Sequence, residues 1–482
     1  MNRSKTIILG TLAAACVLSA TAPALAVTAT TSPLSRRADI ARILLLRDYN
    51  TRVVVAGVTC LGLAAGAVGT FVLLRKRALL GDAVSHATLP GIALAFLIAS
   101  AFGYSGKSLP LLLTGAAISG AIAVLCVLGI IHTSRIKEDA ALGIVLSVFF
   151  GLGVSLSVLA QKQTTGHAAG LDSFIYGKAA AMIAHDAYLI LGGGLLVAVV
   201  CAALFKEFTL LCFDHNYAGA IGLPVVALDI LLMALVVCIT VIGLQAVGLI
   251  LVIAMLVIPP AAANFWTMHL PSMIAISTLI GGASGAAGAI ASALVPGLPS
   301  GAVIVLVAGT VFLLSLFLGS RRGLISRWRE AARLRWSVTR QHLLRAMYEL
   351  AEESFGAPAP GHLPVTETAL LEERSWSLPG LRSALRKLAS QGLLERAASP
   401  DAWRLTDAGE KAAWRVTRAH RLWELYLITH ADIAPNHVDR DADQIEHILD
   451  ADMVSELETE LAKIYPDLAT PPSPHALGPA AL

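Results

Sequence analysis

The chain has few charged residues for its length, and the shortage is greatest in its membrane-like part. Only 14% of the 482 residues are Asp, Glu, Lys or Arg, whereas soluble domains carry about a quarter. Residues 230–320 contain none of the four, while the sequence after Gly319 is densely charged. With 56% hydrophobic residues, this pattern excludes a wholly soluble protein and predicts a membrane domain followed by a soluble one. The net charge of +3 is too small to indicate nucleic-acid binding by itself.

Cysteine is also scarce, and a nucleotide-binding loop is missing. The six cysteines form no CxxC or similar cluster and lie mostly in apolar segments, so we interpret them as packed side chains rather than disulfides or metal ligands. Gly103–Ser108 has the order of a phosphate loop, but Ala101 stands where the leading glycine is required. We therefore predict no nucleotide site and no enzymatic activity in this chain.

The first 26 residues have the layout of a secretory signal peptide. Two basic residues precede the apolar run Thr6–Leu18, and Ala24–Ala26 offers a small-residue cleavage site. The run is shorter than the ~20 residues that span a bilayer, which favours cleavage after Ala26 over the alternative, an uncleaved anchor helix. Residues 27–52 form an N-terminal segment before the membrane domain.

Nine apolar stretches of spanning length are predicted in the transmembrane domain, residues 53–320. They lie near residues 53–74, 84–102, 109–131, 140–160, 187–205, 225–243, 246–266, 271–294 and 301–319. Alternation through nine spans places the three most basic loops, Arg75–Arg77, Arg135–Lys137 and the stretch from Arg321, on one side. The positive-inside rule makes that side cytoplasmic. We therefore expect a multi-pass protein of a prokaryotic inner (plasma) membrane whose C-terminal domain is cytoplasmic.

Gly81–Gly91 is the most informative segment, because it places an acid and an imidazole four residues apart where the chain enters apolar sequence. Residues four apart share one helix face, and ionisable groups in hydrocarbon are costly unless they line a polar path or bind something. The oxygen of Asp82 and the nitrogen of His86 suit manganese, iron(II) or zinc better than calcium or magnesium. The alternative is that Asp82 caps the helix and His86 is an ordinary buried histidine.

Four segments of the membrane domain stand out as motifs. They are Gly81–Gly91, Asp214–Pro224, Gln245–Pro260 and Pro299–Gly301. Together they resemble the permease subunits of ABC transporters that import manganese, zinc or iron, over roughly residues 47–322. The resemblance implies that Asp82 and His86 coordinate the transported divalent ion midway through the membrane. It also implies three partners, namely a cytoplasmic ATP-binding subunit, an extracytoplasmic metal-binding protein and a second permease subunit, identical or different.

The predicted cytoplasmic segment Lys206–Pro224 is built from small, helix-forming residues. The same resemblance implies that this segment docks into the ATPase subunit, and we assign Asp214, Ala218 and Gly222 to the docking loop. The alternative is an ordinary connecting helix.

Two other features of the membrane domain are interpreted as structural. Asp229 lies near the expected membrane face, so we expect its side chain to snorkel to the interface. Gly281, Gly285 and Gly288, spaced by four and three residues, indicate close packing of helices rather than a ligand site.

The soluble part begins with a basic amphipathic stretch, which we predict to be a linker helix over residues 321–336 that contacts anionic lipid or nucleic acid. Helices are then expected at Leu343–Glu353, Val365–Leu371 and Ser377–Gln391, followed by a two-stranded wing over Leu393–Thr406 with its turn at Asp401–Trp403. This order is typical of a winged helix-turn-helix, whose third helix enters a major groove of DNA.

The third predicted helix has a basic face that could contact DNA. This face consists of Arg382, Arg386 and Lys387. The alternative is a surface that docks another protein.

Beyond the wing, two predicted helices carry nitrogen and oxygen ligands. His420 and Glu424 are four apart on one helix, and Asp443, Glu446 and His447 share a face of the next, which makes a credible transition-metal site. Roughly residues 337–455 resemble the metal-dependent repressors related to the diphtheria toxin and manganese-transport repressors. That resemblance implies metal binding by His420, Glu424, Glu446 and His447, with Asp443 at a position that the family fills with various ligands.

The sequence departs from this second family at one ligand position. The family supplies further ligands at the start of its first helix, where this chain has His342 and Arg345. Arginine cannot ligate a metal and brings a positive charge beside the ion. The alternative for the whole set is a solvated charged helical face. We take residues 337–460 as the repressor-like domain and residues 461–482, rich in Pro and Ala, as a disordered tail.

The sequence therefore predicts an all-α polytopic membrane protein with about nine transmembrane helices, followed by a cytoplasmic winged helix-turn-helix and a helical metal-binding domain. The predicted function is the permease subunit of an ATP-driven importer of a divalent transition metal ion (Mn, Zn or Fe). The same ion is the expected ligand of a fused metal-sensing domain that regulates transport. The alternative is a membrane-tethered, metal-responsive, DNA-binding regulator.

Overall fold

The computed structural model describes residues 42–43, 45–77, 79–102, 108–162, 182–295, 298–355, 363–374, 376–431 and 459. These residues fold into two compact units that divide between Arg327 and Trp328. The predicted signal peptide, residues 1–26, and the predicted tail, residues 461–482, lie outside the described residues, so both stay predictions.

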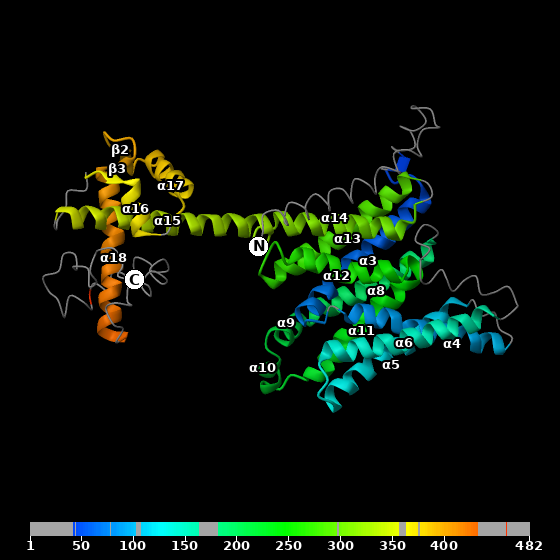
Figure 1. Cartoon of the computed structure of the whole chain (residues 1–482). Helices are drawn as coiled ribbons and strands as arrows, with labels where there is room; N and C mark the ends of the chain where they lie inside the picture. The colour runs from blue at the N-terminus through cyan, green and yellow to red at the C-terminus, as the bar shows by residue number, and fades with distance from the viewer. Residues whose placement is uncertain are drawn as a thin grey trace. The chain divides into compact units, whose positions relative to one another are not determined.

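The first unit is a bundle of apolar helices (Figure 1). All nine predicted spans are helical, and eight of the described helices are long and apolar enough to cross a membrane. These eight are α3 (Tyr49–Leu74), α4 (Leu80–Ala101), α5 (Leu109–Thr133), α6 (Glu138–Gln161), α8 (Ala184–Ala203), α11 (Val225–Val247), α13 (Leu270–Leu294) and α14 (Ser300–Leu318). Two short helices, α9 (Phe205–Phe213) and α10 (His215–Ala220), connect α8 to α11.

The ninth predicted span is α12 (Leu249–Ala263), which is shorter than expected. Its 15 residues correspond to about 22 Å, less than the ~30 Å hydrocarbon core of a bilayer. The chain breaks between α11 and α12 at Gly248, whose φ of +87° is open to glycine and strained for other residues. The uniformly apolar sequence around Gly248 gives no periodicity from which this break could be predicted.

Helices α3 and α13 pack backbone against backbone. A Cβ atom on Gly281 would overlap the carbonyl oxygen of Gly62, and one on Gly285 would lie 2.9 Å from the carbonyl oxygen of Val58. Gly288 makes a similarly close approach to α14. The predicted close packing at these three glycines is therefore confirmed.

Helix α4 belongs to a second group, with α5 and α6, and α11 contacts both groups (Figure 1). Gly91 of α4 faces Gly115 of α5 so closely that a Cβ atom on Gly91 would overlap the carbonyl oxygen of Gly115. Ser119 of α5 adds a hydrogen bond from its Oγ to the carbonyl oxygen of Ala87, at 2.6 Å. These contacts fix the helix that carries the candidate site.

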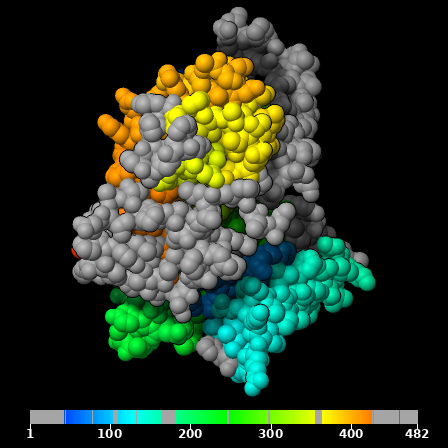
Figure 2. Space-filling model, turned by 60° about the vertical axis from the view of Figure 1, so that its left-hand side comes forward, coloured from blue at the N-terminus to red at the C-terminus, as the bar shows by residue number. Residues whose placement is uncertain are grey.

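The second unit has the predicted winged-helix order. Its elements are α15 (Leu324–Phe355), whose first four residues belong to the first unit, β1 (Val365–Thr366), α16 (Glu367–Glu373), α17 (Leu378–Ser390), β2 (Leu394–Arg396), β3 (Ala402–Leu405) and α18 (Asp407–Ala431). The strands form an antiparallel sheet in the order β1-β3-β2. A separate hydrophobic core joins α15, α16, α17 and the strands, and the yellow and orange atoms of this unit adjoin one another in Figure 2. Residues 324–336 of the predicted linker belong to α15.

The turn of the wing differs from the prediction. It spans residues 397–401, and Ala402 and Trp403 belong to strand β3 rather than to the turn. The Trp403 side chain is buried in the core of the unit, at 3% exposure, and burial of a large side chain contributes about 1.5–3 kcal/mol. Pro400 favours the bend instead. The predicted turn at Asp401–Trp403 is therefore wrong.

The backbone contact between α3 and α13 predicts that replacing a glycine at this contact costs much more stability than replacing a glycine elsewhere. Gly281→Ala should lower the free energy of unfolding of the first unit by about 1–3 kcal/mol, because its methyl group has no space. The matched control is Gly309→Ala on α14, where nothing lies within 4 Å. The unfolding temperature of each variant in detergent measures the difference, and equal values for both would contradict the packing described.

Candidate metal site and its surroundings

Asp82 and His86 lie on one face of α4, within its first two turns. The Oδ1 atom of Asp82 is 3.4 Å from Nε2 of His86, and the two side chains are 35% and 23% exposed. The His86 ring packs edge-on against Phe150 of α6, with ring centroids 4.9 Å apart. The structure brings the predicted pair together, but near the beginning of α4 rather than halfway along it.

Asp82 and His86 lack the hydrogen bonds that the ordinary structural roles would give them. Asp82 does not cap α4, because the capping position is Leu79 and the helix has no side-chain cap hydrogen bond. A satisfied buried histidine has partners for its ring nitrogens. Nδ1 of His86 is instead buried without a hydrogen-bond partner among the described residues. Metal binding by this pair stays a prediction.

Pro90 lies four residues after His86 in α4. Proline has no N–H group, so the carbonyl oxygen of His86 lacks its helical donor. A carboxylate and an imidazole suit manganese, iron(II) or zinc. In the described part of the chain, no three His, Cys, Asp or Glu side chains gather as a metal site.

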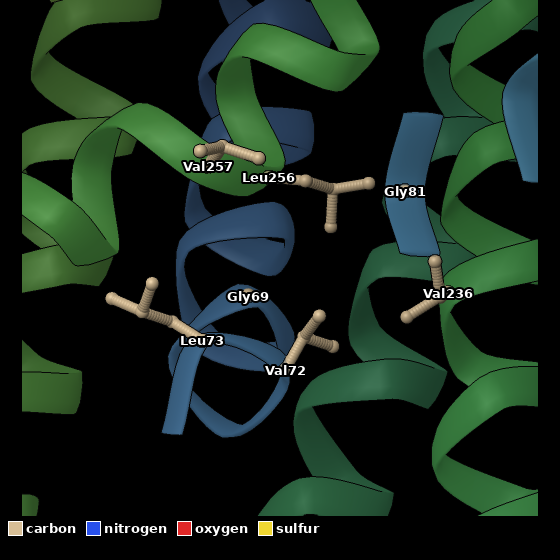
Figure 3. Close-up of a pocket in the computed structure, with 7 residues that line it drawn as sticks. All are labelled: Gly69, Val72, Leu73, Gly81, Val236, Leu256 and Val257. Carbon is tan, nitrogen blue, oxygen red and sulfur yellow. The ribbon is translucent and has the colours of Figure 1, made fainter. Parts of the chain in front are cut away.

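A small apolar cavity borders the site at Gly81, directly before Asp82 (Figure 3). Its volume of about 10 Å³ is close to the smallest that holds one water molecule. It is lined by Gly69, Val72 and Leu73 of α3, Gly81 of α4, Val236 of α11, and Leu256 and Val257 of α12. The side chains that line the cavity offer no polar atoms.

A buried ionic network joins the ends of several helices beside the site. Asp229 of α11 accepts hydrogen bonds from Nη2 of Arg75 at 3.0 Å and pairs with Nη1 of Arg77 at 2.9 Å. Arg77 also pairs with Glu138, the first residue of α6. Arg75 reaches α9, where its Nη1 donates to the carbonyl oxygen of Leu211 at 3.2 Å.

The expectation that Asp229 snorkels to the interface is wrong. Its exposure is 6%, and two guanidinium groups compensate its charge inside the protein. The network also places the loop after α3 next to the start of α6, which agrees with the predicted alternation of the spans.

The predicted docking residues determine the conformation of the loop, and two of them, Asp214 and Gly222, are also exposed on it. Asp214 is the N-cap of α10 and accepts a hydrogen bond from the backbone N–H of Tyr217 at 2.9 Å. Ala218 is fully buried, and its carbonyl oxygen accepts a hydrogen bond from Leu223. Gly222 turns the chain with a φ of +87°. These three residues therefore shape the loop.

The exposed surface of this loop carries large apolar side chains beside the polar residues Asp214, His215 and Asn216. Phe213, Tyr217 and Ile221 are 65%, 55% and 53% exposed and recur every four residues. These three residues were not predicted from the sequence, although this spacing of large apolar residues beside polar ones was a usable signal.

Cys212, just before them, is half-buried, and burial raises the pKa of its thiol to about 12. The thiol is therefore protonated and inert, in agreement with its interpretation as a packing residue.

The second predicted metal site is described only in part. His420 and Glu424 lie on α18, fully buried, with Nε2 of His420 3.2 Å from Oε1 of Glu424. Asp443, Glu446 and His447 lie outside the described residues, so their role stays a prediction. Beside His420 lies the guanidinium group of Arg345, on α15.

The predicted DNA-contacting side chains of α17 have different surroundings. Arg382 binds Glu367 at 2.7 Å, and Nζ of Lys387 lies 3.8 Å from the ring centre of Trp336. Burial alone would raise the pKa of the Glu367 carboxyl group. The hydrogen bonds from Arg382 and Trp403 have the larger effect, so the pKa of Glu367 lies below its ordinary value. Nε of Arg386 donates to the backbone carbonyl oxygen of Arg382 at 3.1 Å. All three basic side chains are thus exposed and also make contacts within the unit.

Comparison with known proteins decides the family. The profile described as the ABC 3 transport family matches residues 47–319. The chain belongs to this family. A second profile, described as the iron dependent repressor, metal binding and dimerisation domain, matches residues 406–474 of this ABC 3 family member. Both resemblances found in the sequence are confirmed.

Relatives of this ABC 3 family member include named transport proteins. The manganese transport system membrane protein MntC of Bacillus subtilis is 39% identical over 396 residues, covering 82% of this chain and 88% of the relative. The zinc transport system membrane protein TroC of Treponema pallidum is 42% identical over 286 residues, covering 59% and 94%. The solved structure of PsaBC from Streptococcus pneumoniae in complex with Fab has a TM-score of 0.51 at 32% identity, covering 59% of this chain and 97% of that one. The match to MntC is longer than the family match, so the similarity extends beyond the membrane domain.

The ionic network predicts that loss of the Asp229 charge strongly destabilises the folded chain. Asp229→Asn leaves two buried guanidinium groups without their shared carboxylate, and removal of one partner of a buried ion pair costs about 3–5 kcal/mol. We expect a large fall in the unfolding temperature of the purified chain. Asp139→Asn is the matched control, because Asp139 is an exposed acid at the start of α6. A fall of equal size in both variants would contradict the role given to the network.

Proposed function

We propose that this chain is the permease subunit of an ABC importer whose cargo is a divalent transition metal ion: manganese, zinc or iron(II). The observation that carries the proposal is the Asp82–His86 pair on α4, where a carboxylate oxygen and an imidazole nitrogen with an unpartnered Nδ1 share one helix face. The names of the relatives, a manganese and a zinc transport protein, support the same class of cargo.

The partners of the permease follow from this proposal. The chain has no phosphate loop, so a separate ATP-binding subunit hydrolyses ATP. We propose that it docks on the exposed side chains of Phe213, Tyr217 and Ile221, which the capped α10 holds in place. An extracytoplasmic metal-binding protein delivers the ion, and a second permease subunit completes the pore. The docking loop and the C-terminal unit then lie in the cytoplasm, as the positive-inside rule predicts.

The alternative function is a membrane-tethered, DNA-binding regulator. The winged-helix order of the second unit and the exposed Arg386 on α17 favour it. Its test is the binding of random-sequence duplex DNA by the full chain in nanodiscs. DNA binding that Arg386→Glu abolishes would support this function, while no binding at moderate salt would exclude it.

The transport proposal predicts a loss of uptake in two single variants. Asp82→Ala and His86→Ala should each reduce ATP-dependent uptake of labelled manganese, zinc or iron(II) into proteoliposomes at least tenfold, because each removes one metal ligand. The control is His185→Ala, which removes an exposed imidazole at the start of α8. Unchanged uptake in both site variants, with normal assembly, would reject the site.

The docking proposal predicts loss of the ATPase subunit from the complex. Ile221→Asp places a charge on the apolar surface of the loop and should weaken co-purification with the ATPase at least tenfold. Asn216→Asp, on the same exposed loop but outside this surface, is the control. Intact co-purification of Ile221→Asp would show that the ATPase binds elsewhere.

A further inference from the structure

The family profile over residues 406–474 implies a metal in the second unit, so the donors around His420 can be tested for fit. Nη1 of Arg345 lies 2.7 Å from Nδ1 and 2.8 Å from Nε2 of His420. Both side chains are buried, at 3% and 1% exposure. A metal bound to either ring nitrogen lies about 2.0–2.1 Å from it, in the space that the guanidinium group occupies.

The charged groups around His420 also disfavour a metal ion at this position. Nε of Arg345 pairs with Oε2 of Glu349 at 3.3 Å, and Nε2 of His420, which the guanidinium group contacts, also lies 3.2 Å from Oε1 of Glu424. One buried carboxylate and one imidazole therefore contact this permanent cation directly. A divalent ion added here would stand next to the guanidinium group in a poorly solvated interior, where repulsion between like charges is strong.

The guanidinium group also connects two helices of the second unit. Arg345 lies on α15, at the start of the winged-helix part, and His420 and Glu424 lie on α18, beyond the wing. The contact with the His420 imidazole joins the two helices, while the carboxylate of Glu349 holds the guanidinium group from within α15. An imidazole and a carboxylate are groups that a transition metal selects. A second pair, Arg421 with Glu352, joins the same two helices nearby.

We propose that Arg345 is a built-in substitute for the metal ion, and that the His420–Glu424 pair binds no divalent metal. The residues present do not fit the ion that the family implies at this position. The contact between α15 and α18 is then independent of the metal concentration, and the second unit does not sense metal through these two residues.

The first test counts ions on the full chain in nanodiscs. Asp82→Ala/His86→Ala is the background, so that transport ligands add nothing and failure of the transport proposal leaves this test unaffected. The chain is equilibrated with Mn²⁺ or Zn²⁺, and the bound metal is measured by mass spectrometry. We expect the ion count to be unchanged by His420→Gln. A decrease of one ion per chain would overturn the proposal.

The second test reverses the substitution. Arg345→Glu replaces the cation by a carboxylate, and we expect it to gain one ion per chain that His420→Gln removes again. A chain with Glu at position 345 that gains no such ion would show that the guanidinium group is not what excludes the metal, and would overturn the proposal.

Thermal unfolding supplies a readout that leaves His420 intact. In the same background, Mn²⁺ should not raise the unfolding temperature of the second unit while Arg345 is present, since a ligand that does not bind the folded state cannot stabilise it. Arg345→Met should unfold at a lower temperature, and Arg345→Lys should recover part of the loss. An increase with Mn²⁺ in the Arg345 chain that His420→Gln removes would contradict the proposal.

Discussion

The charge of Asp229 and its compensation by Arg75 and Arg77 are the interaction on which the arrangement of the membrane unit depends. A carboxylate inside an apolar bundle is tolerated when cations surround it, and here both cations come from the short connection between α3 and α4. The same arginines hold the start of α6 and the end of α9. The connection that leads into α4 therefore contacts α9, the helix that leads into the loop proposed to bind the ATPase.

The same pair of residue types occurs in both units, in different surroundings. In each, an acid and a histidine are four residues apart on one helix, with side-chain atoms 3.2–3.4 Å from one another. The pair on α4 is partly exposed and has an unpartnered ring nitrogen among the described residues, whereas the pair on α18 is fully buried against a guanidinium group. Spacing alone cannot distinguish a metal site from an ion pair, because the decisive group comes from a different helix.

The sequence predicted the elements that depend on local patterns. Long apolar runs gave the spans, and the spacing of Asp82 and His86 gave the shared helix face. The failures concern partners that are distant in the sequence. Asp229 was misplaced because Arg75 and Arg77 lie some 150 residues earlier, as the separation of 154 residues in one of its hydrogen bonds shows. The turn of the wing was misplaced because the core that buries Trp403 comes from other segments.

The glycine contact between α3 and α13 has a consequence for motion. Where side chains interdigitate, two helices can slide by changing rotamers, but a carbonyl oxygen pressed against a glycine backbone leaves nothing to rearrange. Helices α3 and α13 thus behave as one rigid body. A conformational change in this unit therefore leaves the register of α3 against α13 unchanged.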